Sequence, residues 1–289
     1  MYFIAVDFTD SSAICKIRAF PSSSAEPMIT EYLQDDEVLA ACSHEASILN
    51  CWYLNYGSPP NWQPMATPAH NYRSNETHSH YVSDGWLIFG NNGNSTFSAE
   101  ILSGKNEKWQ QLREFHEDEP FPSLACSVSL DMDNQVLITG GMSRLRSSSA
   151  ARILDLDTET LREVSPMPSD MYGHSCILTE SGEVLVAGGR RSNMAMSDLP
   201  LHHSYLYNVE EDTWRRIQDL PIPRRPLLFH MNGKTALAAA NAKSAKKRSI
   251  WTLKGSEWKL LDKYEGIMNY LPKANLLPTN LKIPCVPHN

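Results

Sequence analysis

The segment that decides the fold runs from residue 172 to residue 221 and reads YGHSCILTESGEVLVAGGRRSNMAMSDLPLHHSYLYNVEEDTWRRIQDLP. It contains an apolar run that ends in Gly188-Gly189, a second apolar run at 204–207, and an acidic turn that leads to Trp214. Short apolar runs that are separated by turn residues are typical of β-strands. The segment therefore predicts a small antiparallel sheet with a glycine pair at the end of one strand.

The same pattern recurs along the chain at a nearly constant interval. Short apolar runs end in small residues at positions 42, 90, 140, 188 and 239, so the intervals are 48, 50, 48 and 51 residues. Self-similarity at a fixed period of this length indicates a repeat architecture in which each repeat is one sheet. A large apolar residue follows each run at a similar offset: Trp62, Trp109, Leu161, Trp214 and Trp258.

The clearest copy resembles the kelch repeat, through His174, Gly188-Gly189, Tyr207, Trp214 and the closing Leu220-Pro221. This resemblance implies an all-β fold, a kelch-type β-propeller. We expect one domain over 1–289 with six four-stranded blades. Residues 28–262 supply five blades, and a hairpin in 1–27 completes a sixth with the tail 263–289. Small residues are expected where inner strands approach closely, and Trp where the gap between blades widens.

Composition sets further bounds. The chain has 26 basic and 33 acidic residues and a net charge of −7. No apolar run reaches the roughly 18 residues of a membrane helix, and no secretory signal is visible, so we expect a cytoplasmic or nuclear protein without a membrane partner.

The six cysteines form no C-x-x-C pair, which predicts no metal and favours reduced, buried thiols. Cys126 and Cys176 are expected near each other on inner strands of neighbouring blades.

No catalytic constellation is evident. The H-x-D spacing of His116-Glu117-Asp118 lies in an acidic link and is interpreted as a solvated loop rather than an iron site. His174, Ser175 and Cys176 fall on an expected inner strand and are interpreted as core. The glycine pairs end strands and do not open helices, so they do not predict a phosphate site. We therefore expect no catalytic residues and no cofactor.

The basic residues are distributed unevenly. In an antiparallel blade with strands a to d, the b–c loops and the d–a links emerge on one face, and the a–b and c–d turns on the other. Acidic residues gather on the c–d turns, where we interpret them as turn formers. Tyr172 and His202 are candidate contacts on the b–c face. The basic residues expected on that face are Arg144, Arg146, Arg190, Arg191, Arg224, Arg225, Lys243, Lys246, Lys247 and Arg248.

Three hypotheses of function follow. The leading one is a non-catalytic propeller, a scaffold or adaptor, that binds an acidic or phosphorylated protein segment through the basic face, with RNA as the alternative partner. The second is an accessory domain, because 133–141 and 182–189 resemble the kelch region of wybutosine-synthesising proteins of the leucine carboxyl methyltransferase family. The third is a sugar-acting propeller enzyme of the sialate mutarotase type.

Overall fold

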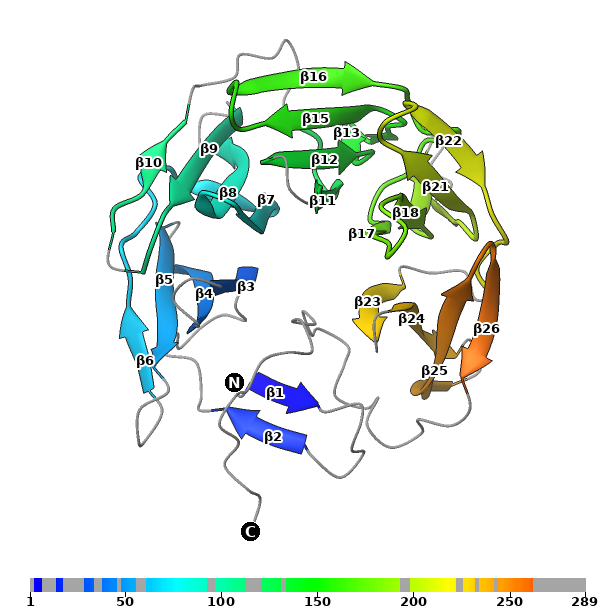
Figure 1. Cartoon of the computed structure of the whole chain (residues 1–289), viewed down its shortest axis with the longest axis horizontal. Coiled ribbons are helices and arrows are strands. Elements are labelled where there is room, and N and C mark those ends of the chain that lie inside the picture. Colours follow the sequence, from blue (N-terminus) through cyan, green and yellow to red (C-terminus); the bar gives the residue numbers. More distant parts are fainter. Residues whose placement is uncertain are drawn as a thin grey trace. The chain divides into compact units, whose positions relative to one another are not determined.

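The computed structural model describes residues 3–6, 14–17, 29–33, 38–45, 48–55, 61–92, 97–105, 107–112, 121–130, 134–192, 198–221, 226–231, 234–241 and 244–261. Within these ranges every regular element is a β-strand, which confirms the all-β prediction (Figure 1). None of the described segments forms a helix of the length and hydropathy that a membrane span requires.

Five four-stranded sheets follow one another along the chain, and we call them blades 1 to 5. In each blade the four strands are called a to d in chain order, and each pairs antiparallel with the next strand of the same blade. The five predicted repeats are therefore confirmed as sheets. Blade 1 contains β3 Ile29–Leu33, β4 Val38–Glu45, β5 Ile48–Asn55 and β6 Asn61–Pro64; blade 2 contains β7 Tyr72–Val82, β8 Gly85–Asn92, β9 Phe97–Leu102 and β10 Gln110–Gln111; blade 3 contains β11 Cys126–Leu130, β12 Gln135–Thr139, β15 Ala151–Asp155 and β16 Thr160–Val164; blade 4 contains β17 Ser175–Leu178, β18 Val184–Ala187, β21 Ser204–Asn208 and β22 Thr213–Arg216; blade 5 contains β23 Leu227–Met231, β24 Lys234–Asn241, β25 Ser244–Lys254 and β26 Glu257–Leu261.

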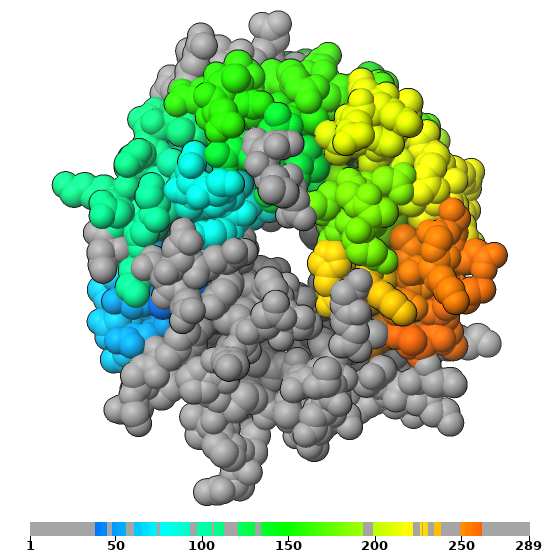
Figure 2. Space-filling model, in the orientation of Figure 1, coloured from blue at the N-terminus to red at the C-terminus, as the bar shows by residue number. Residues whose placement is uncertain are grey.

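The strands belong to two compact units, one with β1 to β10 and one with β11 to β26. In the second unit the blades follow each other in chain order, and the space-filling view shows them as adjoining bands from green through yellow to orange (Figure 2). Their a strands are neighbours, because β17 contacts both β11 and β23. In the first unit, β1 Phe3–Val6 pairs with β2 Ile14–Ile17, which confirms the N-terminal hairpin. The tail 263–289 lies outside the described residues, so the composite sixth blade and the single domain stay predictions.

The apolar cores lie between successive blades. Leu137 and Ile153 of blade 3 share a buried cluster with Val184 and Tyr207 of blade 4. A second cluster, which includes Leu185 and Leu237, joins blades 4 and 5, and another joins blades 1 and 2. Burying apolar faces between sheets stabilises the fold by about 25 cal/mol for each Å² removed from water.

Large aromatic residues fill the gap at the d strands, as predicted. The ring of Trp109 packs on that of Trp86 at a centroid distance of 5.4 Å, and Trp214 packs on Tyr207 at 4.6 Å. The indole Nε1 of Trp214 donates to the backbone oxygen of Ser165 in the preceding blade at 2.7 Å. Trp109 Nε1 makes the equivalent bond to the backbone of the blade before it, at 2.8 Å. The Trp residues are structural.

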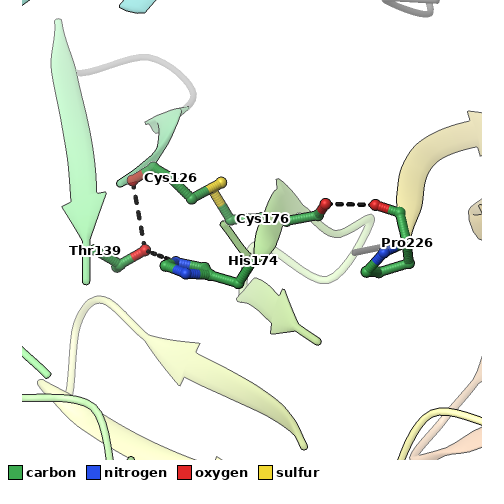
Figure 3. Close-up of a disulfide and its surroundings, with 6 residues drawn as sticks. Cys126, Thr139, His174, Cys176 and Pro226 are labelled. Carbon is green, nitrogen blue, oxygen red and sulfur yellow. Dashed lines mark hydrogen bonds between the residues drawn. A yellow bond between two sulfur atoms is a disulfide. The ribbon is translucent and has the colours of Figure 1, made fainter. Parts of the chain in front are cut away.

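The glycine pairs leave space for one histidine. A Cβ at Gly140 would lie 2.5 Å from the carbonyl oxygen of Met171 and 2.7 Å from Cε1 of His174. A Cβ at Gly189 would lie 2.8 Å from Cβ of His174. The fully buried His174 therefore fits between two blades only because both positions lack a side chain, and its Nε2 lies 2.8 Å from Thr139 Oγ1 (Figure 3). Its interpretation as a core residue is confirmed.

The prediction of reduced thiols is wrong for four of the six cysteines. Cys126 on β11 and Cys176 on β17 form a disulfide that joins the a strands of blades 3 and 4 (Figure 3). Cys42 and Cys51 are directly opposite each other on β4 and β5 and form a second disulfide. The expected proximity of Cys126 and Cys176 is confirmed. A C-x-x-C pattern is not needed for these bonds, because the strand register and the packing of neighbouring blades bring cysteines together that are distant in sequence.

Candidate functional site

The arginines of the b–c segments lie on two small hairpins rather than on open loops. In blade 3, β13 Met142–Ser143 pairs with β14 Arg146–Ser147. In blade 4, β19 Arg190–Ser192 pairs with β20 Asp198–Pro200. Each hairpin follows a glycine pair whose residues all have positive φ, which turns the chain out of the plane of the blade. The structure therefore gives these arginines a regular support that the sequence did not indicate.

The two hairpins are joined by hydrogen bonds between serines. The backbone nitrogen of Ser192 donates to Ser147 Oγ at 3.2 Å, and Ser147 Oγ donates to Asp170 Oδ2 at 2.6 Å. Ser192 Oγ in turn donates to the backbone oxygen of Leu145 at 3.2 Å. Residues from two blades and from the link between them thus hold one another in place.

A charged pair completes this connection. Arg191 Nε donates to Asp170 Oδ1 at 2.8 Å, and the two side chains form an ion pair. The hydrogen bond from Arg191, supported by that from Ser147, lowers the pKa of Asp170 to about 2, and the same bond raises the pKa of Arg191. We call Ser147, Asp170, Arg191 and Ser192 the brace. The guanidinium of Arg191 is paired with Asp170, so Arg191 has a structural role in connecting the second hairpin to the link between blades 3 and 4.

The first hairpin has an unusual turn. Its two loop residues, Arg144 and Leu145, have φ of 48° and 66°. A two-residue turn with both residues at positive φ is normally built from Asn-Gly or Asp-Gly, because other L-residues lose about 1–2 kcal/mol each in the left-handed region. Neither residue of this turn is Asn, Asp or Gly, and Leu145 is 74 % exposed. Local strain of this kind at an exposed position points to a function other than folding.

The other residues predicted to contact a partner lie on the second hairpin, β19–β20, or next to it in the structure. Arg190 is exposed, and its backbone exchanges two hydrogen bonds of 2.9 Å with the backbone of the half-buried Tyr172. Leu199, opposite Arg191, is 54 % exposed. His202 is exposed, and its Nδ1 lies 3.2 Å from the backbone oxygen of Leu220. Tyr172 thus supports the base of the hairpin, and His202 lies at its edge.

The other basic residues are placed differently or not described. Arg224, Arg225 and Lys243 lie outside the described residues. Lys246, Lys247 and Arg248 belong to β25, so the prediction of an open loop there is wrong. The reason is that β24 and β25 continue their pairing, through a register shift at Ala240/Asn241, as far as Asn241 and Ser244.

The acidic c–d turns behave as turn formers. Asp155 accepts hydrogen bonds from the backbone nitrogen and the hydroxyl of Thr158, at 2.9 and 2.8 Å. Asp212 accepts from Tyr207 Oη at 2.6 Å and from the backbone of Ser165 at 2.8 Å. These carboxylates stabilise the turn itself or the contact with the preceding blade, which agrees with their interpretation as structural.

One buried carboxylate in the first unit was missed by sequence reasoning. Glu100 is fully buried and accepts hydrogen bonds from the backbone nitrogens of Ala69 and His70, at 2.8 and 2.9 Å, and from Tyr72 Oη at 3.1 Å. His70 Nδ1 lies 3.0 Å from the same carboxylate. Burial, followed by the charge of Glu100, raises the pKa of Tyr72. With its acceptor sites occupied, Glu100 fixes the link between blades 1 and 2. Across the described residues, no group of three or more potential ligands is arranged to hold a metal ion.

Comparisons with known proteins agree with this architecture. No family model matches the chain, and no curated protein sequence matches it. Among solved structures, the chain is similar to YjhT, with a TM-score of 0.67 and 11 % identity over 90 % of each chain. It is also similar to a fungal alcohol oxidase of the AA5 family in complex with copper, with a TM-score of 0.50 and 12 % identity, over 73 % of this chain and 58 % of the oxidase. The chain thus spans less than two thirds of that oxidase. At these identities the similarity establishes the fold alone: the chain has the β-propeller fold, as YjhT does.

Proposed function

We propose that this propeller is a non-catalytic binding module, a scaffold or adaptor, that engages an acidic segment of another protein. The contact is made by the hairpin surface, which we define as Arg144, Leu145, Arg146, Arg190 and Leu199. The observation that supports the proposal is the presence of three exposed arginines on two hairpins that the brace holds together.

Electrostatics favours an anionic partner for this surface. A guanidinium binds a carboxylate or phosphate through two parallel hydrogen bonds, and such bonds are about twice as strong as neutral ones. Arg191 and Asp170 form an ion pair within the brace, whereas Arg144, Arg146 and Arg190 are exposed on the two hairpins, where a partner can reach them. The net charge of the chain is −7, so a local group of cations differs from the average surface and directs an acidic partner to this place.

The disulfides bear on the class of partner. Disulfides form and persist in oxidising compartments and are rare in the cytosol and nucleus. The bonds Cys126–Cys176 and Cys42–Cys51 therefore argue against the cytoplasmic localisation expected from the sequence. They also weaken the hypotheses of an RNA partner and of an accessory domain in a tRNA-modifying enzyme. An acidic protein segment is the anionic partner that agrees with both observations.

A pair of matched variants tests the proposal. The first is Arg144→Glu/Arg146→Glu/Arg190→Glu. The control, Lys234→Glu/Lys254→Glu/Lys259→Glu, reverses three charges on exposed residues of blade 5, of which Lys234 and Lys254 border the opposite turns. Affinity capture from extract under non-reducing conditions, at two salt concentrations and with nuclease, should recover one acidic protein with the wild type and the control. The first variant should lose it. An unchanged capture profile would refute the proposal.

A second candidate is the sugar-acting enzyme of the sialate mutarotase type, which the similarity to YjhT over 90 % of both chains favours. A sugar that binds only the folded chain raises the unfolding temperature. Thermal unfolding with millimolar N-acetylneuraminic acid therefore tests this candidate. A higher midpoint than with the same concentration of glucose supports it, and equal midpoints exclude it.

A further inference from the structure

We propose that the hairpin surface recognises an acidic peptide segment that carries a large apolar side chain, and that Leu145 is the main contact for that side chain. This inference rests on the proposed function and adds the sequence character of the partner. It starts from two leucines that are more than half exposed, Leu145 and Leu199.

The two leucines lie on hairpins that contact each other. The backbone oxygen of Leu145 accepts from Ser192 Oγ, and Ser192 is opposite Asp198, the residue before Leu199. Arginines border both leucines, since Leu145 lies between Arg144 and Arg146 and Leu199 is on the strand opposite Arg190 and Arg191. The surface therefore presents apolar area with cations beside it. Arginine is enriched in the hot spots of binding interfaces, and apolar area beside it excludes water from its contacts.

The turn chemistry indicates that Leu145 is retained for binding. Asn-Gly would form the same turn without strain, yet the chain has Arg-Leu there, with both residues at positive φ. The leucine side chain adds nothing to the core at 74 % exposure. A residue that strains its turn and leaves its side chain in solvent is best explained by a contact with another molecule.

The brace makes the contact rigid before binding. Leu145 is fixed through its carbonyl to Ser192, and Ser147, two residues later, is fixed to Asp170. A surface that is already ordered loses less conformational entropy when a partner binds. A turn held on both sides is therefore suited to a short segment, which has few contacts with which to offset that loss.

The sequence character of the bound peptide follows from the arrangement of leucines and arginines on the hairpin surface. In an extended segment, successive side chains point to opposite sides, so an apolar residue can face a leucine while nearby Asp or Glu residues reach the arginines. We expect Asp or Glu within two positions of a Leu, Ile, Phe or Trp. A purely acidic segment would leave both leucines in solvent, and a purely apolar one would place no charge opposite the exposed arginines.

A random peptide library displayed on phage tests this inference on the full chain under non-reducing conditions. Enriched peptides should contain the acidic–apolar pattern, and the best one, labelled with fluorescein, should bind with an affinity measured by fluorescence polarisation. Leu145→Ala should weaken this binding at least tenfold. Leu260→Ala, which truncates a leucine that is 59 % exposed on β26, is the matched control and should leave the affinity unchanged.

A second variant separates binding from folding. Arg144→Asn/Leu145→Gly restores the usual residues of the turn, so its unfolding temperature should rise while peptide binding is lost. A structural role for Leu145 predicts the opposite sign for stability. Equal affinities for Leu145→Ala and Leu260→Ala would refute the inference, as would enrichment of peptides without the pattern. If acidic peptides still depend on Arg144, Arg146 and Arg190, only this inference fails; if no peptide depends on them, the proposed function fails too.

Discussion

Removal of the Cys126–Cys176 disulfide should cost the protein much of its stability. The two cysteines are separated by 50 residues, so the bond closes a loop of 51 residues. In the chain-entropy model, closing a loop of this length in the unfolded state stabilises the fold by about 4 kcal/mol. This is comparable to much of the total stability of an ordinary domain, which is about 5–15 kcal/mol. The double variant Cys126→Ala/Cys176→Ala should therefore be strongly destabilised.

The second disulfide provides an internal reference. Cys42 and Cys51 are separated by 9 residues, so the loop contains 10 residues and the same model gives about 2.7 kcal/mol. The difference between the two double variants, about 1.4 kcal/mol, depends only on the logarithm of the ratio of loop lengths, 51 to 10. Errors that are common to both variants, such as the loss of a sulfur contact, cancel in this comparison.

Urea unfolding followed by tryptophan fluorescence measures both values. The wild type should lose stability when a reductant is added, whereas a variant that lacks both disulfides should not respond to it. Thiol titration of the unfolded, unreduced protein should detect neither Cys126 nor Cys176. Free thiols at these positions, or a loss below about 1 kcal/mol for Cys126→Ala/Cys176→Ala, would refute the reasoning and restore the prediction of reduced cysteines.

Three further predictions concern packing and protonation. Gly140→Ala should cost about 2–4 kcal/mol in urea unfolding because its Cβ meets Met171 and His174 at 2.5 and 2.7 Å, whereas Gly173→Ala, with a similar φ of 57° but open space, should cost only about 1 kcal/mol. Equal losses would show that strain in φ, rather than the close approach, explains the glycine pair. Asp170→Asn should cost about 1 kcal/mol at neutral pH, a value reduced for the exposure of Arg191, which is 50 %. Because the pKa of Asp170 is lowered to about 2, its contribution is present above pH 4 and decreases as the pH falls through 2, so the urea midpoints of the two proteins should converge as the pH approaches 2. Burial, followed by the nearby His78, lowers the pKa of His80 to about 3, so the unfolded chain binds a proton at His80 that the folded chain excludes, and stability should decrease as pH falls below about 6.5. His80→Phe, which keeps an aromatic ring over Phe89, should remove up to about 1.4 kcal/mol per pH unit of that decrease; an unchanged pH profile would contradict the lowered pKa of His80.

The blades could be predicted from the sequence because the recurring glycine and tryptophan residues each have a single structural role. A glycine such as Gly189 marks a close approach of two backbones, and a tryptophan such as Trp214 fills a wide gap, so both reappear at the same position of the repeat. The period then places the strands without knowledge of any contact. The a strand of blade 4 and its core residue His174 were found in this way.

The hairpin surface was only partly predictable. The strands β13 and β14 have two residues each, too short for any periodic signal, and the turn residues Arg144 and Leu145 contradict the usual turn chemistry. The arginines were found from their charge and their position between strands b and c. Leu145 and Leu199 were missed because a single exposed leucine is common in sequences and only the structure shows that these two are on neighbouring hairpins.

Cysteine pairing was open to a better reading of the same register. Cys126 pairs with Thr139, the residue before Gly140, and Cys176 pairs with Val186, two residues before Gly188. The two cysteines are therefore one position apart on adjacent a strands, so their side chains leave opposite faces of their sheets and can face each other. Cys42 and Cys51 lie at equal distances from the b–c turn, which places them opposite each other. The position of each cysteine in the repeat therefore indicates which cysteines are close to each other. It does not indicate whether they are oxidised.

The bonds between Trp214 and Ser165 have a consequence for how this chain acquires its structure. The indole of Trp214 and the carboxylate of Asp212 both bind the backbone of Ser165, which directly follows the last strand of blade 3. A sheet excised by itself would therefore expose an aromatic ring and leave several hydrogen-bonding groups to water. Two adjacent sheets are the smallest fragment in which these groups are satisfied. During synthesis the end of blade 3 would then provide the docking site for the outer strand of blade 4, so that these two sheets assemble as a pair rather than as independent modules.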